Sequence, residues 1–234
     1  TAMSYQTEYQ AALENPEEFW KQKADALKWY KSPASILSQD EHGIHHWFAD
    51  GEMNTCYMAL DYHVESGRGD QTALIYDSPV TDQKASYTYT QLRDAVALCA
   101  GMLKTQGVTK GDRVIIYMPM IPEAAIAMLA CARLGAIHSV VFGGFAPREL
   151  AVRIDDARPK VIMSASCGIE IKRVIEYKPL LDRAIEIAGH KPESCIIFQR
   201  PEAAASMTEG RDLDWQEELA VASPADCVPV KGTD

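Results

Sequence analysis

The chain has 234 residues, of which 47% are hydrophobic and 24% are charged. This composition is typical of a globular protein and excludes a chain that is mainly disordered. The formal net charge is −10, which argues against a nucleic-acid partner because phosphate backbones require a basic surface. No apolar run approaches the roughly 20 residues that span a bilayer, and the first residues do not resemble a secretory signal. We therefore expect no membrane association.

The cysteines and histidines give no sign of a disulfide framework or a metal site. No two cysteines form a CxxC pair, and three of them lie in apolar runs, which is typical of reduced, buried thiols in a cytoplasmic protein. Three histidines lie close together, but no cysteine or carboxylate shares a helix face with them, so we predict no metal site. The cysteines are at 56, 99, 131, 167, 195 and 227, and the histidines at 42, 45 and 46.

The charge is distributed unevenly along the chain. Residues 141–200 carry 10 basic and 8 acidic side chains, whereas residues 201–234 carry 2 and 8. An anionic ligand would therefore meet the least repulsion in the middle block. A window of this length also varies by this much without any functional meaning.

Residues 1–52 read as a helical and extended lead-in. Asn15 is suited to cap a helix, Pro16 to occupy its first position, and Glu17 and Glu18 its first turn. Beyond this helix, proline and glycine punctuation predicts extended or looped chain that wraps a larger body. We take residues 53–234 as the second part of the chain, beginning with a helix over 54–65.

The next segment predicts two short strands and a long helix. Residues 71–76 and 85–88 read as strands. Thr88 and Gln91 have the spacing of a capping box at the start of the helix, which has one apolar face and ends at Gly107.

Strands then alternate with helices. Strands are predicted at 113–117, 137–141, 159–164 and 194–198, and helices at 123–134, 147–156 and 179–188. This alternation predicts an α/β fold with a doubly wound parallel sheet and helices on both faces. A last short helix is predicted at 214–219, followed by an extended, polar stretch.

The turn Phe142-Gly143-Gly144-Phe145 is the most informative local feature. It follows a buried strand and precedes a helix, where open α/β sheets bind ligands and where glycine lets a ligand approach the backbone. An equally good interpretation is a tight turn that needs a positive φ. The chain contains neither GxGxxG nor GxxxxGK[ST], so both common nucleotide fingerprints are missing.

The second feature is the run Glu170-Ile171-Lys172-Arg173. An arginine at the carboxyl end of a strand suits a bidentate phosphate contact. The alternative, which these residues alone favour, is the solvated start of a helix.

Several motifs in order resemble the acyl-adenylate-forming enzymes. They are Tyr87-Thr-Tyr-Thr-Gln-Leu92, Gly111-Asp-Arg-Val114, Tyr117-Met-Pro-Met-Ile-Pro-Glu123, Ala132-Arg-Leu-Gly-Ala-Ile-His-Ser139 and Val141-Phe-Gly-Gly-Phe145. More narrowly, the stretches His45–Phe48 and Gly51–Asn54 are similar to the lead-in of the short-chain acyl-CoA synthetases. Details such as Tyr62-His63 and Tyr76–Pro79 look closer to the propionate branch.

The resemblance implies a two-step reaction that uses ATP, Mg²⁺ and CoA to convert propionate to propionyl-CoA, AMP and pyrophosphate. It also implies that the phosphate loop, the Mg²⁺-binding acidic segments and the catalytic lysine lie beyond residue 234. We therefore expect the isolated segment to be inactive and to hold no catalytic residue. An acetate-specific relative, or a non-catalytic module that binds CoA or a protein, remains an alternative.

The resemblance further implies CoA contacts at Phe142, Gly143 and Gly144, and at a following segment where the family has two arginines three residues apart. The second of these matches Arg173, whereas the first falls on Glu170, so Lys172 would have to supply part of the positive field. Because later strands would normally pair with this part, exposed edges favour self-association, and a homodimer could result from the truncation alone.

Overall fold

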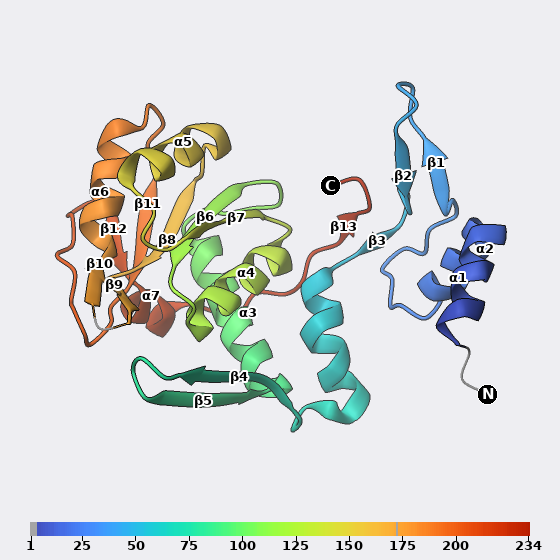
Figure 1. Cartoon of the computed structure of the whole chain (residues 1–234), viewed down its shortest axis with the longest axis horizontal. Coiled ribbons are helices and arrows are strands. Elements are labelled where there is room, and N and C mark those ends of the chain that lie inside the picture. Colours follow the sequence, from blue (N-terminus) through green and yellow to red (C-terminus); the bar gives the residue numbers. More distant parts are fainter. Residues whose placement is uncertain (1–3, 172) are drawn as a thin grey trace.

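The computed structural model describes residues 4–171 and 173–234, and Figure 1 shows an α/β body with an N-terminal arm beside it. The body is built on a five-stranded sheet in the order β12-β11-β8-β6-β7, in which every recorded pairing is parallel. Its strands are β6 (Arg113–Met118), β7 (Ile137–Phe142), β8 (Val161–Ala165), β11 (Ser194–Phe198) and β12 (Asp212–Asp214).

Helices cover both faces of this sheet, as predicted. On one face lie α3 (Tyr89–Thr105), α4 (Pro122–Leu134) and α7 (Trp215–Val221), and on the other lie α5 (Pro147–Ala157) and α6 (Tyr177–Ile187). A hydrophobic core lies on each face of the sheet, and successive side chains of β6 point into them alternately. Val114 and Ile116 pack in the core beneath α3 and α4, and Ile115 and Tyr117 pack in the core beneath α5 and α6. Strands that are buried on both faces explain the continuous apolar runs of the sequence.

The helix ends follow the local signals. Thr88 and Gln91 form both hydrogen bonds of the capping box that opens α3. Pro122 begins α4, and Gly135 ends it with a φ of +66°, a left-handed conformation that glycine adopts without a steric penalty. Asn15 accepts a hydrogen bond from the Glu18 backbone at the start of α2. The predicted starts of α2 and α3 are confirmed, and α4 begins and ends within one residue of its predicted range, 123–134.

The arm contains more regular structure than the sequence predicted. Its two helices, α1 (Tyr5–Glu14) and α2 (Pro16–Ala24), are followed by a hairpin of β1 (Leu37–Gln39) and β2 (His45–Trp47), which lies in the stretch predicted only as extended or looped chain. Strands of three residues are too short to give a periodic pattern, so this hairpin could not be read from the sequence.

The predicted helix over 54–65 is present, and helical hydrogen bonding continues to residue 68, although Gly67, with a φ of +80°, breaks the helical conformation. Most of it is wound as two π-helical segments, η1 (Tyr57–Asp61) and η2 (Val64–Arg68). The next two strands, β4 (Thr72–Ser78) and β5 (Gln83–Thr88), form an antiparallel hairpin beside α3.

Segments distant in sequence meet where the arm joins the body. β3 (Glu52–Met53) pairs antiparallel with β13 (Val230–Lys231). β13 lies in the C-terminal stretch that the sequence predicted only as extended. Asn54 is buried, and its side-chain amide donates to the carbonyls of Ala132, Arg133 and Val228 at 2.9, 3.2 and 2.8 Å. One amide therefore fixes the helix over 55–68 to α4 and to the segment 222–229.

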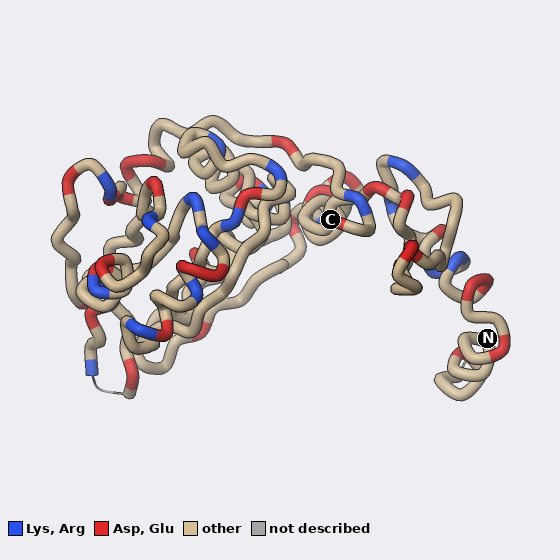
Figure 2. Tube along the Cα trace, turned by 90° about the horizontal axis from the view of Figure 1, so that it is seen from above, with Lys and Arg blue, Asp and Glu red and all other residues tan. Residues whose placement is uncertain are grey.

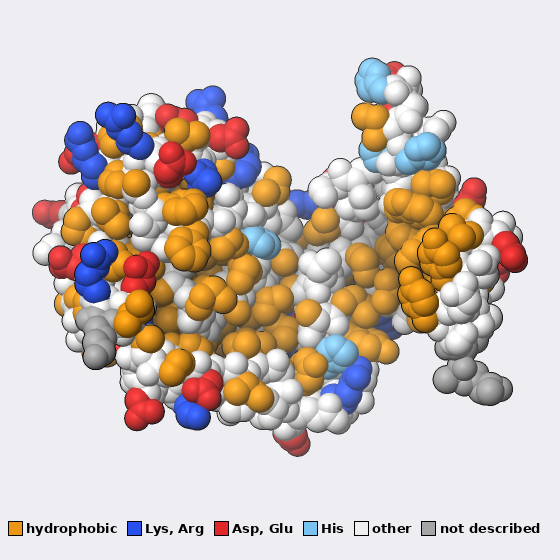
Figure 3. Space-filling model, viewed as in Figure 1, with side chains coloured by type: hydrophobic (Ala, Val, Ile, Leu, Met, Phe, Trp, Pro, Cys, Tyr) orange, Lys and Arg blue, Asp and Glu red, His pale blue; other side chains and the backbone are white. Residues whose placement is uncertain are grey.

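The surface carries both signs of charge. Figure 2 shows Lys and Arg interspersed with Asp and Glu along the trace, whereas Figure 3 shows hydrophobic side chains gathered over the middle of one face. Ile137, Val140 and Phe142 on β7, which lies at one edge of the sheet, are all more than half exposed. In the described part of the chain, no helix is both long and apolar enough to traverse a bilayer.

Candidate functional site

The turn Phe142-Gly143-Gly144, called here the Phe-Gly-Gly turn, lies at the carboxyl edge of the parallel sheet, directly after β7. The Phe142 side chain is 68% exposed and its ring lies 5.7 Å from that of Phe145. The site that the sequence predicted is therefore at the surface of the body, at the edge where α/β sheets bind ligands.

A buried tyrosine from β6 holds this turn from below. The backbone N–H of Gly144 donates to the Tyr117 hydroxyl at 3.2 Å, and that hydroxyl donates to the carbonyl of Phe145 at 3.1 Å. Burial raises the pKa of Tyr117 to about 12, so the hydroxyl keeps its proton at neutral pH and fixes the backbone through both bonds.

The structure gives a reason within the chain for each glycine of the turn. Gly144 has a φ of +87°, so the predicted tight turn with positive φ is confirmed at this position. A Cβ on Gly143 would lie 2.7 Å from Cζ and Cε2 of Tyr177, and one on Gly168 would lie 2.6 Å from the same Cζ. Tyr177 is thus wedged between two glycine backbones that could not otherwise approach it.

Glu170, Ile171 and Arg173 lie at the tip of a hairpin, so the interpretation of this run as a helix start is wrong. β9 (Cys167–Glu170) pairs antiparallel with β10 (Arg173–Glu176), and Glu170 lies opposite Arg173. Ile171 in the connecting turn has a φ of +55° and is 85% exposed, an uncommon conformation for a β-branched residue. Lys172 lies outside the described residues.

This hairpin and the Phe-Gly-Gly turn lie side by side. The Glu170 carboxylate is 3.5 Å from the position that a Cβ on Gly144 would take. Burial, together with the charge of Glu170, raises the pKa of Tyr177 to about 12. The two features singled out in the sequence therefore share one corner of the molecule, where Phe142, Gly143 and Gly144 face a hairpin tip that carries Glu170 and Arg173.

A second candidate site was missed by the sequence analysis. A cavity of about 290 Å³ lies between the β4–β5 hairpin and the carboxyl ends of β6 and β11, with Tyr76, Tyr87 and Glu123 in its wall. Burial raises the pKa of Glu123. Arg200 in the same wall is buried and donates to the carbonyl of Cys167 at 3.0 Å. The only sequence signal was that two predicted strands end here.

The histidines for which no metal site was predicted lie in the β1–β2 hairpin and have neighbouring partners. The ring of His46 is 3.1 Å from the Asp40 carboxylate and that of His45 is 2.8 Å from the Gln39 amide. Elsewhere, Cys56, Asp61 and Cys227 place their ligand atoms within 4.8 Å of one another.

Comparison with known proteins gives matches along almost the whole chain. A family model described as AMP-binding enzyme matches residues 61–231, and one described as acetyl-coenzyme A synthetase N-terminus matches residues 5–59. Among solved structures, the acetoacetyl-CoA synthetase from Streptomyces lividans has a TM-score of 0.85 and 23% sequence identity. That match covers 98% of this chain and 35% of the other, and it supports the fold.

Curated relatives are more similar in sequence. An uncharacterized protein of Pseudomonas aeruginosa is 59% identical, over 99% of this chain and 37% of its own. The mitochondrial acyl-CoA synthetase short-chain family member 3 of Rattus norvegicus is 51% identical, over 97% of this chain and 33% of its own. The propionate–CoA ligase of Salmonella typhimurium is 42% identical, over 95% and 36%.

The chain thus spans about a third of the length of the curated relatives that it matches. The matches confirm the resemblance that the ordered motifs had indicated, and the doubly wound body is the fold which that resemblance implied. The family model alone covers well over half of the residues. The chain belongs to the AMP-binding enzyme family.

Proposed function

We propose that the chain is the N-terminal part of a short-chain acyl-CoA synthetase that makes propionyl-CoA, AMP and pyrophosphate from propionate, ATP and CoA. The observation that supports this most directly is the similarity over more than nine-tenths of the chain to a protein named propionate–CoA ligase. In this proposal residues 1–52 are the lead-in, and residues 53–234 are the first part of the AMP-forming domain.

The proposed reaction has two steps. A carboxylate oxygen of propionate attacks the α-phosphorus of ATP, and pyrophosphate leaves to give propionyl-AMP. The CoA thiol then attacks the acyl carbon, and AMP leaves as the thioester forms. Positive groups placed where charge develops lower the barrier of such steps, and in this proposal those groups belong to the remainder of the protein.

The part assigned to this chain is contact with CoA. The Phe-Gly-Gly turn is exposed at Phe142, and the Tyr117 hydroxyl holds its backbone, so a pantetheine arm could pass along a fixed surface. Arg173 at the hairpin tip would meet a phosphate of CoA, with Lys172 adding positive charge. Glu170 beside Gly144 would oppose a phosphate at that point and so would place it on the Arg173 side.

The one group of three clustered ligating side chains found among the described residues does not fit a Mg²⁺ site. Mg²⁺ prefers oxygen ligands, whereas the cluster of Cys56, Asp61 and Cys227 offers two sulfurs and a carboxylate that is already bound by Arg133. In this proposal the Mg²⁺-binding groups belong to the remainder of the full-length protein, and we predict that the isolated chain performs no ATP–pyrophosphate exchange.

Acyl selectivity is tested by an assay of CoA-dependent product formation in the full-length protein, with acetate, propionate and butyrate side by side. We expect propionate to give the highest kcat/KM, although one methylene group contributes only ~1–3 kcal/mol of discrimination in such a pocket. A preference for acetate would favour an acetyl-CoA synthetase, and no thioester with any acid would favour a non-catalytic binding module.

The proposed CoA contact is tested by Arg173→Ala in the same protein. We expect KM for CoA to rise about tenfold or more, because a charged hydrogen bond contributes roughly 1.5–3 kcal/mol, while ATP–pyrophosphate exchange stays nearly unchanged. Arg183→Ala is the matched control, since Arg183 is an exposed arginine on α6 that pairs with Glu186. A loss of exchange with an unchanged KM for CoA would refute the assignment.

Two further expectations remain predictions. A cytoplasmic location is one, and the name of the rat relative places that protein in the mitochondrion. A homodimer is the other, and the exposed apolar side chains of Ile137, Val140 and Phe142 on the edge strand β7 make it testable by light scattering.

A further inference from the structure

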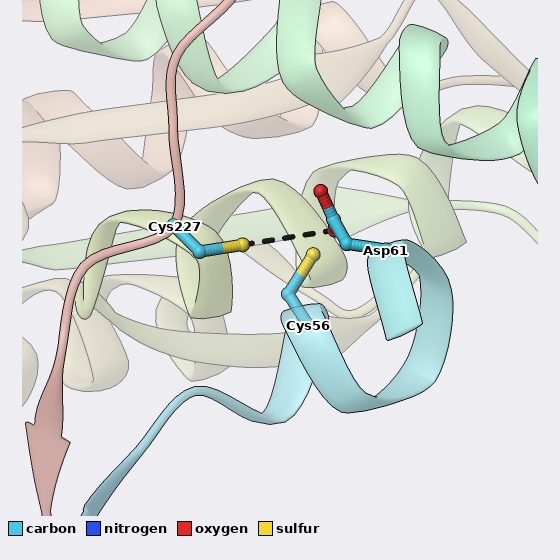
Figure 4. A group of neighbouring side chains, drawn as sticks. All are labelled: Cys56, Asp61 and Cys227. Atoms are coloured by element: carbon cyan, nitrogen blue, oxygen red, sulfur yellow. Dashed lines mark hydrogen bonds between the residues drawn. The ribbon is translucent and has the colours of Figure 1, made fainter. Parts of the chain in front are cut away.

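We propose that Cys56 and Cys227 form a reversible disulfide that fastens the helix over 55–68 to the segment 222–229. The proposal depends on side chains away from the Phe-Gly-Gly turn and is independent of the proposed enzymatic reaction. Figure 4 shows the two sulfur atoms and the Asp61 carboxylate directed toward one another from separate parts of the chain.

The geometry places the two thiols within reach of each other. The sulfur atoms and an Asp61 oxygen all lie within 4.8 Å of one another, and the Cys227 thiol donates to Asp61 at 3.7 Å. A disulfide requires a separation of about 2.05 Å. Cys227 can supply this movement because it lies in an irregular segment, whereas Cys56 is fixed at the start of a helix.

Arg133 makes this a chemically distinctive pair. Its guanidinium donates to both oxygens of Asp61, at 2.7 and 3.0 Å, and to the sulfur of Cys56 at 3.7 Å. The neighbouring Cys227 side chain, helped by Arg133 and opposed by burial, lowers the pKa of Cys56, whereas the pKa of Cys227 is raised. A cysteine of lowered pKa beside an arginine, with a second thiol next to it, has the arrangement of a reactive and a resolving cysteine.

The other cysteines do not share this setting. Cys56, Cys99 and Cys131 are all fully buried, but burial raises the pKa of Cys99 and Cys131, to about 12 for Cys131, whereas the pKa of Cys56 is lowered. Burial likewise raises the pKa of Cys195 to about 12. The same three side chains are poorly suited to bind a divalent cation. The Arg133 guanidinium already pairs with the Asp61 carboxylate, and its positive charge would repel a cation bound there.

The step balances with hydrogen peroxide as the oxidant. The Cys56 thiolate attacks one peroxide oxygen, the O–O bond breaks, and hydroxide leaves as a sulfenic acid forms. The Cys227 sulfur then attacks the Cys56 sulfur, the S–O bond breaks, and water leaves. The Cys227 proton passes to the departing oxygen, directly or by way of Asp61. Two thiols and one peroxide give one disulfide and two waters.

The test is a peptide map of the full chain after brief treatment with hydrogen peroxide. Remaining thiols are alkylated in denaturant, and the chain is cut with trypsin without reduction. The peptides 32–68 and 212–231 each contain a single cysteine, Cys56 and Cys227 respectively. We expect a cross-linked pair lighter by two hydrogens than the sum of the two peptides, and we expect dithiothreitol to separate it.

Two matched variants make the result specific. Cys227→Ser should abolish the cross-linked pair and leave Cys56 as an overoxidised or mixed species, whereas Cys195→Ser should leave the pair unchanged. The proposal is overturned if both peptides of the native chain are recovered only as alkylated or overoxidised monomers. It is also overturned if Zn²⁺ alone protects both thiols from alkylation while peroxide still yields no cross-link.

Discussion

Tyr177, wedged between Gly143 and Gly168, gives a prediction about the Phe-Gly-Gly turn. Carbon atoms are normally about 3.5–4.0 Å apart at contact, yet a Cβ on Gly143 would come within 2.7 Å of two ring carbons of Tyr177. An overlap of this size in a packed core costs ~1–3 kcal/mol. Gly143→Ala should therefore lower the free energy of unfolding by about 2 kcal/mol.

The cause can be isolated with a second substitution. Tyr177→Leu removes the ring atoms that the added methyl group would meet, so Gly143→Ala should cost less than about 0.5 kcal/mol in that background, a coupling of the size expected between residues in contact. Gly144→Ala is the control. Its φ of +87° should cost ~1–2 kcal/mol with or without the ring, because no Tyr177 atom is among the near neighbours of its Cβ position.

The assay is equilibrium unfolding in urea, followed by the fluorescence of the four tryptophans, of which Trp215 is buried in the core. The loss of unfolding free energy caused by Gly143→Ala is compared between the wild-type and the Tyr177→Leu backgrounds. The comparison requires that the m-value stays the same, so that a change in the unfolded state is not mistaken for the steric clash. Equal costs of Gly143→Ala in both backgrounds would refute the reasoning.

Two other predictions concern buried charges. Asp61→Asn should reduce the free energy of unfolding by roughly 3–5 kcal/mol, because it leaves the buried Arg133 without its anion, and a loss under about 1 kcal/mol in urea unfolding would contradict this. Burial alone would raise the pKa of Asp212. Hydrogen bonds from Arg211 and Lys178 lower the pKa by more than burial raises it, so the pKa lies below its ordinary value. The carboxylate therefore stabilises the fold above the unfolded pKa of about 3.9, and this contribution is lost as pH falls through the folded value. The stability gap between the wild type and Asp212→Asn should be constant at neutral pH and narrow below about pH 4, and a gap that widens on acidification would exclude this explanation.

The sequence predicted features that depend on neighbouring residues. Thr88 and Gln91 form a cap within one helical turn, and Gly135 ends α4 by its own backbone conformation. The alternation of strands with helices predicted the doubly wound body in the same way, because the spacing of apolar residues that marks a strand or a helix is set within a few neighbouring positions. The Phe-Gly-Gly turn was located correctly because it follows a predicted strand, but that strand, β7, is a largely exposed edge strand and not the buried strand that was expected.

Features that require distant residues could not be predicted in the same way. The need for glycine at 143 comes from Tyr177, which lies 34 positions further along the chain. The β9–β10 hairpin was mistaken for a helix start because each strand has four residues and Ile171 takes an unusual turn conformation. The approach of Cys56 to Cys227 spans most of the chain, and no periodic signal encodes it.

Asn54 has a consequence for the order in which the molecule folds. Its amide joins carbonyls that lie 78 and 174 residues away, and contacts of such separation carry a large loop-closure entropy. The helix over 55–68 consequently cannot become fixed until α4 has formed and the segment 222–229 has crossed beside it. This junction is completed late, and mutations in it should accelerate unfolding more than they slow folding.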